Sequence, residues 1–77
     1  MIDVRFYDNT HDRIVEWARR EFCQRYPRYL NKNHAPDMAH ISKAIEVCGF
    51  VEVTAANIEH VKTALEIHAL AKAAKQV

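Results

Sequence analysis

Apolar residues recur at helical spacing along residues 54–76, and this run is the longest element that the sequence predicts. It contains no glycine or proline and is rich in Ala, Leu, Glu and Lys, which lose little rotamer freedom in a helix. Thr54 is a good N-cap, because its hydroxyl can accept from backbone N–H groups of the first turn. At 1.5 Å per residue the helix would be about 33 Å long. We therefore expect the rest of the chain to pack on it.

This helix is apolar on two sides. One side, expected to face the core, consists of Ile58, Val61, Leu65 and Ala69. The other side, roughly opposite, consists of Ile67, Leu70, Ala71 and Ala74. A domain of this size buries only about 60% of its unfolded surface, so it cannot easily cover both sides. The second side therefore predicts a homodimer interface. The alternative is that the helix is alanine-rich and its second side is simply exposed to solvent.

The N-terminal part of the chain reads as a strand followed by a helix. Residues 2–7 alternate strictly between apolar and polar side chains, the period of a half-buried strand. Residues 10–26 follow with helical spacing, and Pro27 ends this helix because proline disfavours the helical conformation of the residue before it. The apolar face of this first helix is formed by Ile14, Val15, Ala18 and Phe22.

A second helix and a second strand are predicted between residues 36 and 53. Pro36 suits the first position of a helix over 36–48, and Gly49 falls where a left-handed C-terminal cap is expected. Residues 50–53, Phe-Val-Glu-Val, are short and β-branched, which indicates a strand.

The predicted order is strand-helix-helix-strand-helix in a single small domain over residues 1–77. We expect a mainly helical α+β fold, with a small two-stranded sheet and a long C-terminal helix. The two strands could pair with each other, but a lone two-stranded sheet is weak and needs helical cover or extension in a dimer. The alternative is an all-α three-helix domain in which both apolar runs are extended arms.

Composition indicates a globular chain whose global charge implies no particular partner. The hydrophobic share is 49% and the formal net charge is +1. No apolar run approaches transmembrane length, and charged residues interrupt residues 1–12, so we expect neither a membrane span nor a signal peptide. Cys23 and Cys48 are then expected to be thiols in a reducing cytoplasm.

Several chemistries fit the sequence poorly. The single glycine argues against P-loop and Rossmann phosphate cradles, which need several. Ser42, the only serine, lies inside a predicted helix without a nucleophile motif. The spacing of the natural four-ligand candidate matches no short-loop zinc pattern, the set being Cys23, His34, His40 and Cys48. We therefore expect no metal, no cofactor and no enzymatic activity.

The outer face of the first helix is the candidate binding surface. Trp17 lies off the apolar face and among arginines, so we expect it to be partly exposed. Aromatic residues and arginines supply much of the energy of protein interfaces, and they also bind nucleic acid. Residues 19–32 carry five Lys or Arg against one Glu, a local charge of 5 − 1 = +4. The predicted binding residues are Trp17, Arg13, Arg20, Gln24, Arg25 and Arg28.

The preferred hypothesis is a small non-enzymatic interaction module that binds or inhibits a larger protein. In size the chain is similar to accessory proteins carried by phages and mobile elements. The alternative is a nucleic-acid-binding accessory or regulatory protein that uses the basic first helix.

Overall fold

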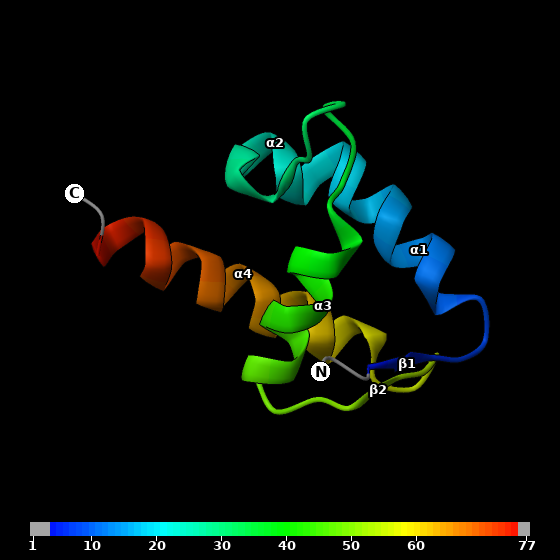
Figure 1. Ribbon diagram of the computed structural model, residues 1–77. Helices are drawn as coiled ribbons and strands as arrows, with labels where there is room; N and C mark the ends of the chain where they lie inside the picture. Colours follow the sequence, from blue (N-terminus) through cyan, green and yellow to red (C-terminus); the bar gives the residue numbers. More distant parts are fainter. Residues whose placement is uncertain (1–3, 76–77) are drawn as a thin grey trace.

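The computed structural model describes residues 4–75 as two very short strands and a set of helices (Figure 1). The predicted mainly helical α+β fold, in the order strand-helix-helix-strand-helix, is confirmed. The elements are β1 (Arg5–Phe6), α1 (Thr10–Trp17), a π-helical turn (Ala18–Phe22), α2 (Cys23–Arg25), a 3-10 helix (Pro27–Tyr29), α3 (Met38–Val47), β2 (Glu52–Val53) and α4 (Ile58–Lys75).

The two strands pair in parallel, with Arg5 opposite Glu52 and Phe6 opposite Val53. Parallel strands need a long crossover, which α1 to α3 supply here. The paired segments are shorter than the predicted strands 2–7 and 50–53, of which residues 2–3 lie outside the described residues. β1 ends early because Asp8 and Asn9 take left-handed conformations, with φ of 55° and 63°, and turn the chain into α1.

The first helical segment is continuous from residue 10 to residue 25 but contains a π-helical turn. There the N–H of Cys23 donates to the carbonyl of Ala18, five residues back. An extra residue in one turn rotates all later side chains back by about 100°, because an α-helix has 3.6 residues per turn. Phe22 is thereby brought back toward Trp17, and the two rings stack with centroids 5.0 Å apart and an interplanar angle of 22°.

Helix α3 begins at Met38 and not at Pro36, because Asp37 is its N-cap. The Asp37 carboxylate accepts from the backbone N–H of His40 at 3.2 Å. The predicted left-handed cap at Gly49 is confirmed, with φ of 99° and a hydrogen bond from its N–H to the carbonyl of Glu46 at 2.9 Å.

Helix α4 begins at Ile58, four residues later than predicted. Thr54 and Asn57 form the preceding turn through reciprocal bonds: the N–H of Thr54 donates to Asn57 Oδ1 at 2.8 Å, and the N–H of Asn57 donates to Thr54 Oγ1 at 3.3 Å. This is the geometry of a capping box, so Thr54 does cap the turn that leads into the helix. The predicted core stripe is confirmed, since all four members are buried: Ile58, Val61, Leu65 and Ala69.

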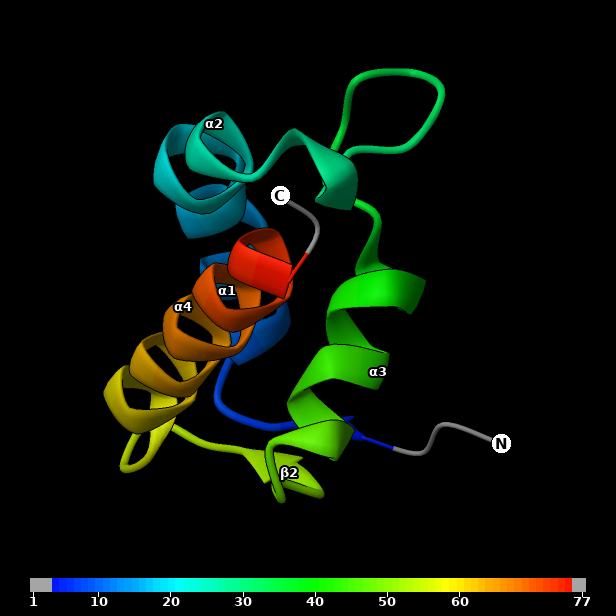
Figure 2. The same ribbon diagram turned by 90° about the vertical axis from the view of Figure 1, so that its left-hand side faces the viewer.

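The core lies where α4 meets α1, the π-helical turn and α3 (Figure 2). At the sheet end of this core, the buried Thr10 hydroxyl donates to the carbonyl of Val53 at 3.0 Å and ties the start of α1 to β2. At the other end, residues of α3, α4 and the 3-10 helix line a pocket.

Candidate functional site

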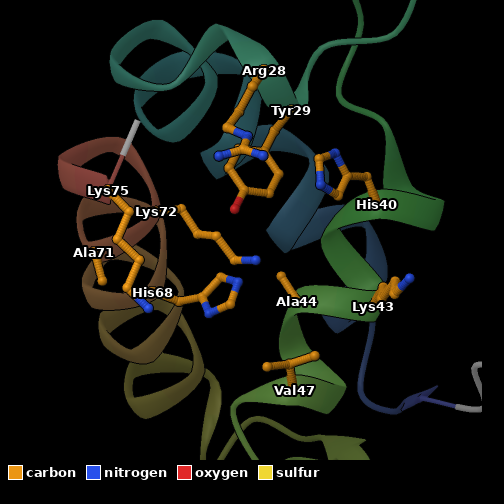
Figure 3. A pocket seen from close by; sticks show the side chains of 10 residues that line it. All are labelled: Arg28, Tyr29, His40, Lys43, Ala44, Val47, His68, Ala71, Lys72 and Lys75. Atoms are coloured by element: carbon orange, nitrogen blue, oxygen red, sulfur yellow. The ribbon is translucent and has the colours of Figure 1, made fainter. Parts of the chain in front are cut away.

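A pocket of about 450 Å³ lies between α3 and α4 beneath the 3-10 helix. Figure 3 shows side chains from all three elements pointing into it. Small apolar side chains of α3 and α4 form part of its wall, and basic and aromatic side chains form the rest. The lining consists of Arg28, Tyr29, His40, Lys43, Ala44, Val47, His68, Ala71, Lys72 and Lys75.

The charges in this pocket are all positive. Arg28 comes from the 3-10 helix and Lys43 from α3, whereas Lys72 and Lys75 come from α4. Within residues 4–75, none of these four cations forms an ion pair, and no carboxylate lines the pocket. Cations gathered from three elements without a counter-charge create a positive potential that favours an anion.

His68 responds to this potential. Its pKa is lowered from the usual 6.5, first by burial and then by Lys72, Arg28 and His40. The second histidine of the pocket, His40, stacks on Tyr29 with ring centroids 4.5 Å apart. An anion placed between the helices would offset this repulsion and favour protonation of His68.

Tyr29 gives the pocket a rigid roof. It is 1% exposed and packs on Phe22, with ring centroids 4.8 Å apart. The Arg28 guanidinium carbon lies 5.8 Å from the centre of the Tyr29 ring, a cation–π contact that holds Arg28 over the pocket. Burial raises the pKa of the Tyr29 hydroxyl, so it stays protonated, and Figure 3 shows it directed toward the side chains of α4.

The prediction that Trp17 is partly exposed is wrong. The side chain is 8% exposed and belongs to the core cluster. The reason is the π-helical turn, which returns Phe22 to the Trp17 side of the helix and makes Trp17 part of the buried face. Lys62 of α4 also covers the indole, with its Nζ 5.9 Å from the centre of the ring.

Three of the predicted binding residues, Trp17, Arg13 and Arg20, do line one shallow depression on α1. Lys62 of α4 lines it too, and three carboxylates share it with these basic groups, so its charge is mixed, the acids being Asp12, Glu16 and Glu21.

The basic block at 19–32 is not one surface. Arg19 and Arg20 both pair with Glu16, at 3.2 and 2.8 Å, and Arg25 pairs with Glu66 of α4 at 2.7 Å. The Gln24 amide donates to the carbonyl of Arg19 at 3.3 Å. Of the six predicted binding residues, only Arg28 lines the basic pocket.

The second apolar side of α4, which was predicted to be a dimer interface, is exposed to solvent. Ile67 and Leu70 are 64% and 61% exposed, and Ala71 and Ala74 are exposed as well. Ala71 also lines the basic pocket, so the two surfaces adjoin on α4.

Sequence reasoning missed most of the pocket. His68, Lys72 and Lys75 are spaced four and three residues apart, so they share one face of α4, and this signal could have been found. Lys43 and Arg28 could not have been added to them, because only the packing of α3 and the 3-10 helix against α4 brings them together.

Both cysteines are engaged in the fold. Burial raises the pKa of the Cys23 and Cys48 thiols, and each donates to a backbone carbonyl, Cys23 to Tyr29 at 3.7 Å and Cys48 to Ala64 at 3.6 Å. Across residues 4–75, no three His, Cys, Asp or Glu side chains lie together as metal ligands would. No helix in that range is long and apolar enough to cross a membrane.

Comparison with protein-family models, with curated proteins and with solved structures finds no match to this chain. Its function is therefore inferred from the geometry and charge of its own surfaces.

Proposed function

We propose that this protein is a small non-enzymatic module that binds nucleic acid through phosphate groups in the basic pocket between α3 and α4. The observation that carries the proposal is that four cations line this pocket and that, within residues 4–75, no carboxylate lines it. Phosphate contacts from Lys and Arg dominate the affinity of proteins for nucleic acids. They position the ligand without reading its sequence, so we expect little sequence preference.

This proposal moves the nucleic-acid surface away from the outer face of α1. Just after α1, Arg19 and Arg20 are paired with Glu16, and Arg25 of α2 is paired with Glu66, so these three arginines have less charge to offer a phosphate. The case for Trp17 as the anchor of a protein partner is weaker too, because its ring is buried.

Binding without catalysis fits the state of the two thiols. Their raised pKa values keep Cys23 and Cys48 protonated and poorly nucleophilic at neutral pH. We propose a reducing cytoplasm as the compartment, where such thiols persist.

The test is binding of labelled single-stranded DNA and RNA across a salt series, followed by fluorescence anisotropy. The pocket variant is Lys72→Gln/Lys75→Gln, and the matched control, Arg19→Gln/Arg20→Gln, removes the same charge from α1. On single strands the salt slope falls by about 0.7 for each phosphate that the protein no longer neutralises. We expect the slope to fall by about 1.4 in the pocket variant and to change little in the control.

Absence of binding at low salt would overturn the proposal, as would an equal fall of the slope in both variants. The labelled strand is also run on a denaturing gel after incubation. Recovery at full length is the expected result for a protein that binds without cleaving.

The exposed apolar side of α4 favours a second function, binding of a protein partner, for which we propose a second copy of this chain. Ile67 and Leu70 are large apolar side chains left largely in water. Light scattering at micromolar concentration should give the mass of a dimer, and Leu70→Glu should give the mass of a monomer. A wild-type monomer would contradict this second proposal and leave the first one standing.

A further inference from the structure

We propose that the basic pocket binds the phosphorylated end of a nucleic-acid strand, a terminal phosphomonoester, in preference to an internal phosphodiester. This inference rests on the proposed function and names the part of the nucleic acid that enters the pocket. Two observations carry it, the charge of the pocket and the closure of the pocket at both of its ends.

The charge favours a ligand with more than one negative charge. Four cations share a pocket of about 450 Å³: Arg28, Lys43, Lys72 and Lys75. An internal phosphodiester carries a single negative charge. A terminal phosphomonoester carries about −1.5 to −2 near neutral pH and offers three strong acceptor oxygens. It can therefore accept more charge-assisted hydrogen bonds from the ammonium and guanidinium groups of the lining than an internal phosphate can.

The ends of the pocket leave no path for a continuous backbone along the helices. At one end Arg28 and Tyr29 of the 3-10 helix lie across the space between α3 and α4 (Figure 3). At the other end α3 and α4 are in contact, because the Cys48 thiol at the C-terminus of α3 donates to the carbonyl of Ala64 at 3.6 Å. A strand can therefore reach the cations more easily with its end than with its middle.

The lining explains how such an end would be held. Lys72 extends from α4 into the space between the helices, whereas Lys75 runs along α4 and Lys43 lies at the rim on α3 (Figure 3). Arg28 presents a planar guanidinium from the roof, suited to two phosphate oxygens at once. The Tyr29 and His40 rings are stacked on each other, which leaves less ring face for a base. Recognition would then depend on the phosphate and not on the base next to it.

The experiment compares three oligonucleotides of one sequence, each with an internal dye: one with a 5′-phosphate, one with a 3′-phosphate and one with hydroxyls at both ends. At least one phosphorylated form should bind about tenfold more tightly than the hydroxyl form, because its terminal phosphate accepts additional hydrogen bonds from charged groups. The preference should disappear in Lys72→Gln/Lys75→Gln and persist in Arg19→Gln/Arg20→Gln. Thermal unfolding of both variants confirms that they are folded.

The outcomes separate this inference from the proposed function. Equal affinity for all three strands would overturn the end preference and leave nucleic-acid binding intact, whereas no binding of any strand would overturn both. A preference that survives in the pocket variant would place the end elsewhere and overturn the inference. A nucleoside monophosphate is tested as a competitor. If it binds as tightly as the phosphorylated strand, the pocket belongs to a free nucleotide and the inference is wrong.

Discussion

Two regions of this molecule carry many basic side chains, and they differ in what surrounds those side chains. On the outer face of the first helical segment, Arg19 and Arg20 of the π-helical turn share one carboxylate, that of Glu16 of α1. In the pocket between α3 and α4, no carboxylate from residues 4–75 joins the cations of the lining. The sequence makes the first region conspicuous because its arginines are close together in the chain. The difference teaches that a local count of cations says little about local potential until the ion pairs are known.

The largest expected effect concerns the stability of the α1 region. Trp17→Ala should lower the free energy of unfolding by about 3–5 kcal/mol, because it removes a large buried ring stacked on Phe22. Chemical denaturation followed by circular dichroism measures the change. Arg20→Ala, on the exposed face of the same segment, should change it by no more than about 0.5 kcal/mol. A Trp17→Ala protein as stable as the wild type would restore Trp17 as a surface anchor.

The second prediction uses the histidine of the pocket. Because the folded protein lowers the pKa of His68, protonation favours the unfolded state. The stability that His68 contributes is present above the unfolded pKa of about 6.5 and is lost as pH falls through the lower folded pKa. A bound anion offsets the repulsion from the neighbouring cations and favours protonated His68 in the folded state, so sulfate, which remains a dianion, should raise the melting midpoint more at about pH 5 than at about pH 8.

The check is a melting series with and without sulfate in wild type, His68→Gln and His40→Gln. The gain of sulfate stabilisation at low pH should shrink in His68→Gln. If only His40→Gln abolishes the gain, the pH dependence belongs to the other histidine. The titratable and charged groups that face the site from the three elements are Arg28, Tyr29, His40, Lys43, His68, Lys72 and Lys75.

The third prediction would break the comparison by making the two regions alike. Glu16→Gln removes the carboxylate that pairs with both Arg19 and Arg20. The two arginines that lose their partner should strengthen single-strand binding. The magnitude of the salt slope should increase by at most about 1.4. Glu21→Gln makes the same charge change on the same helical segment, where Glu21 has no ion pair among residues 4–75. Equal effects of the two variants would mean that the ion pairs with Glu16 do not prevent Arg19 and Arg20 from binding phosphate.

The smallest expected effect is an unchanged melting midpoint. Chelator and reductant, added separately to a thermal unfolding experiment, should leave the midpoint unchanged. Both thiols donate to backbone carbonyls, and within residues 4–75 no cluster of side chains suits a metal. A marked drop with either reagent would reveal that the fold depends on a metal or on a disulfide.

Local periodicity was enough to predict the fold and not enough to predict the site. The stripe from Ile58 to Ala69 was readable because one helix obeys one period over its whole length. The prediction that Trp17 lies off the apolar face is wrong because the α-helical period of 3.6 residues does not continue through the π-helical turn. The pairing of Arg25 with Glu66 joins residues 41 apart, and the presence of Lys43 and Lys72 in the lining of one pocket also depends on packing. No pattern within a single element contains that information.

The π-helical turn has a consequence for how this chain can change over evolution. The turn holds one residue more than an α-helical turn. It therefore sets the direction in which the later side chains of the segment point, and it sets the position of the 3-10 helix that carries Arg28. Deleting one residue from Ala18–Phe22 would rotate that continuation by about 100° and carry Arg28 away from the pocket between α3 and α4. Substitutions on the surface of this segment should therefore be tolerated far better than any change in its length.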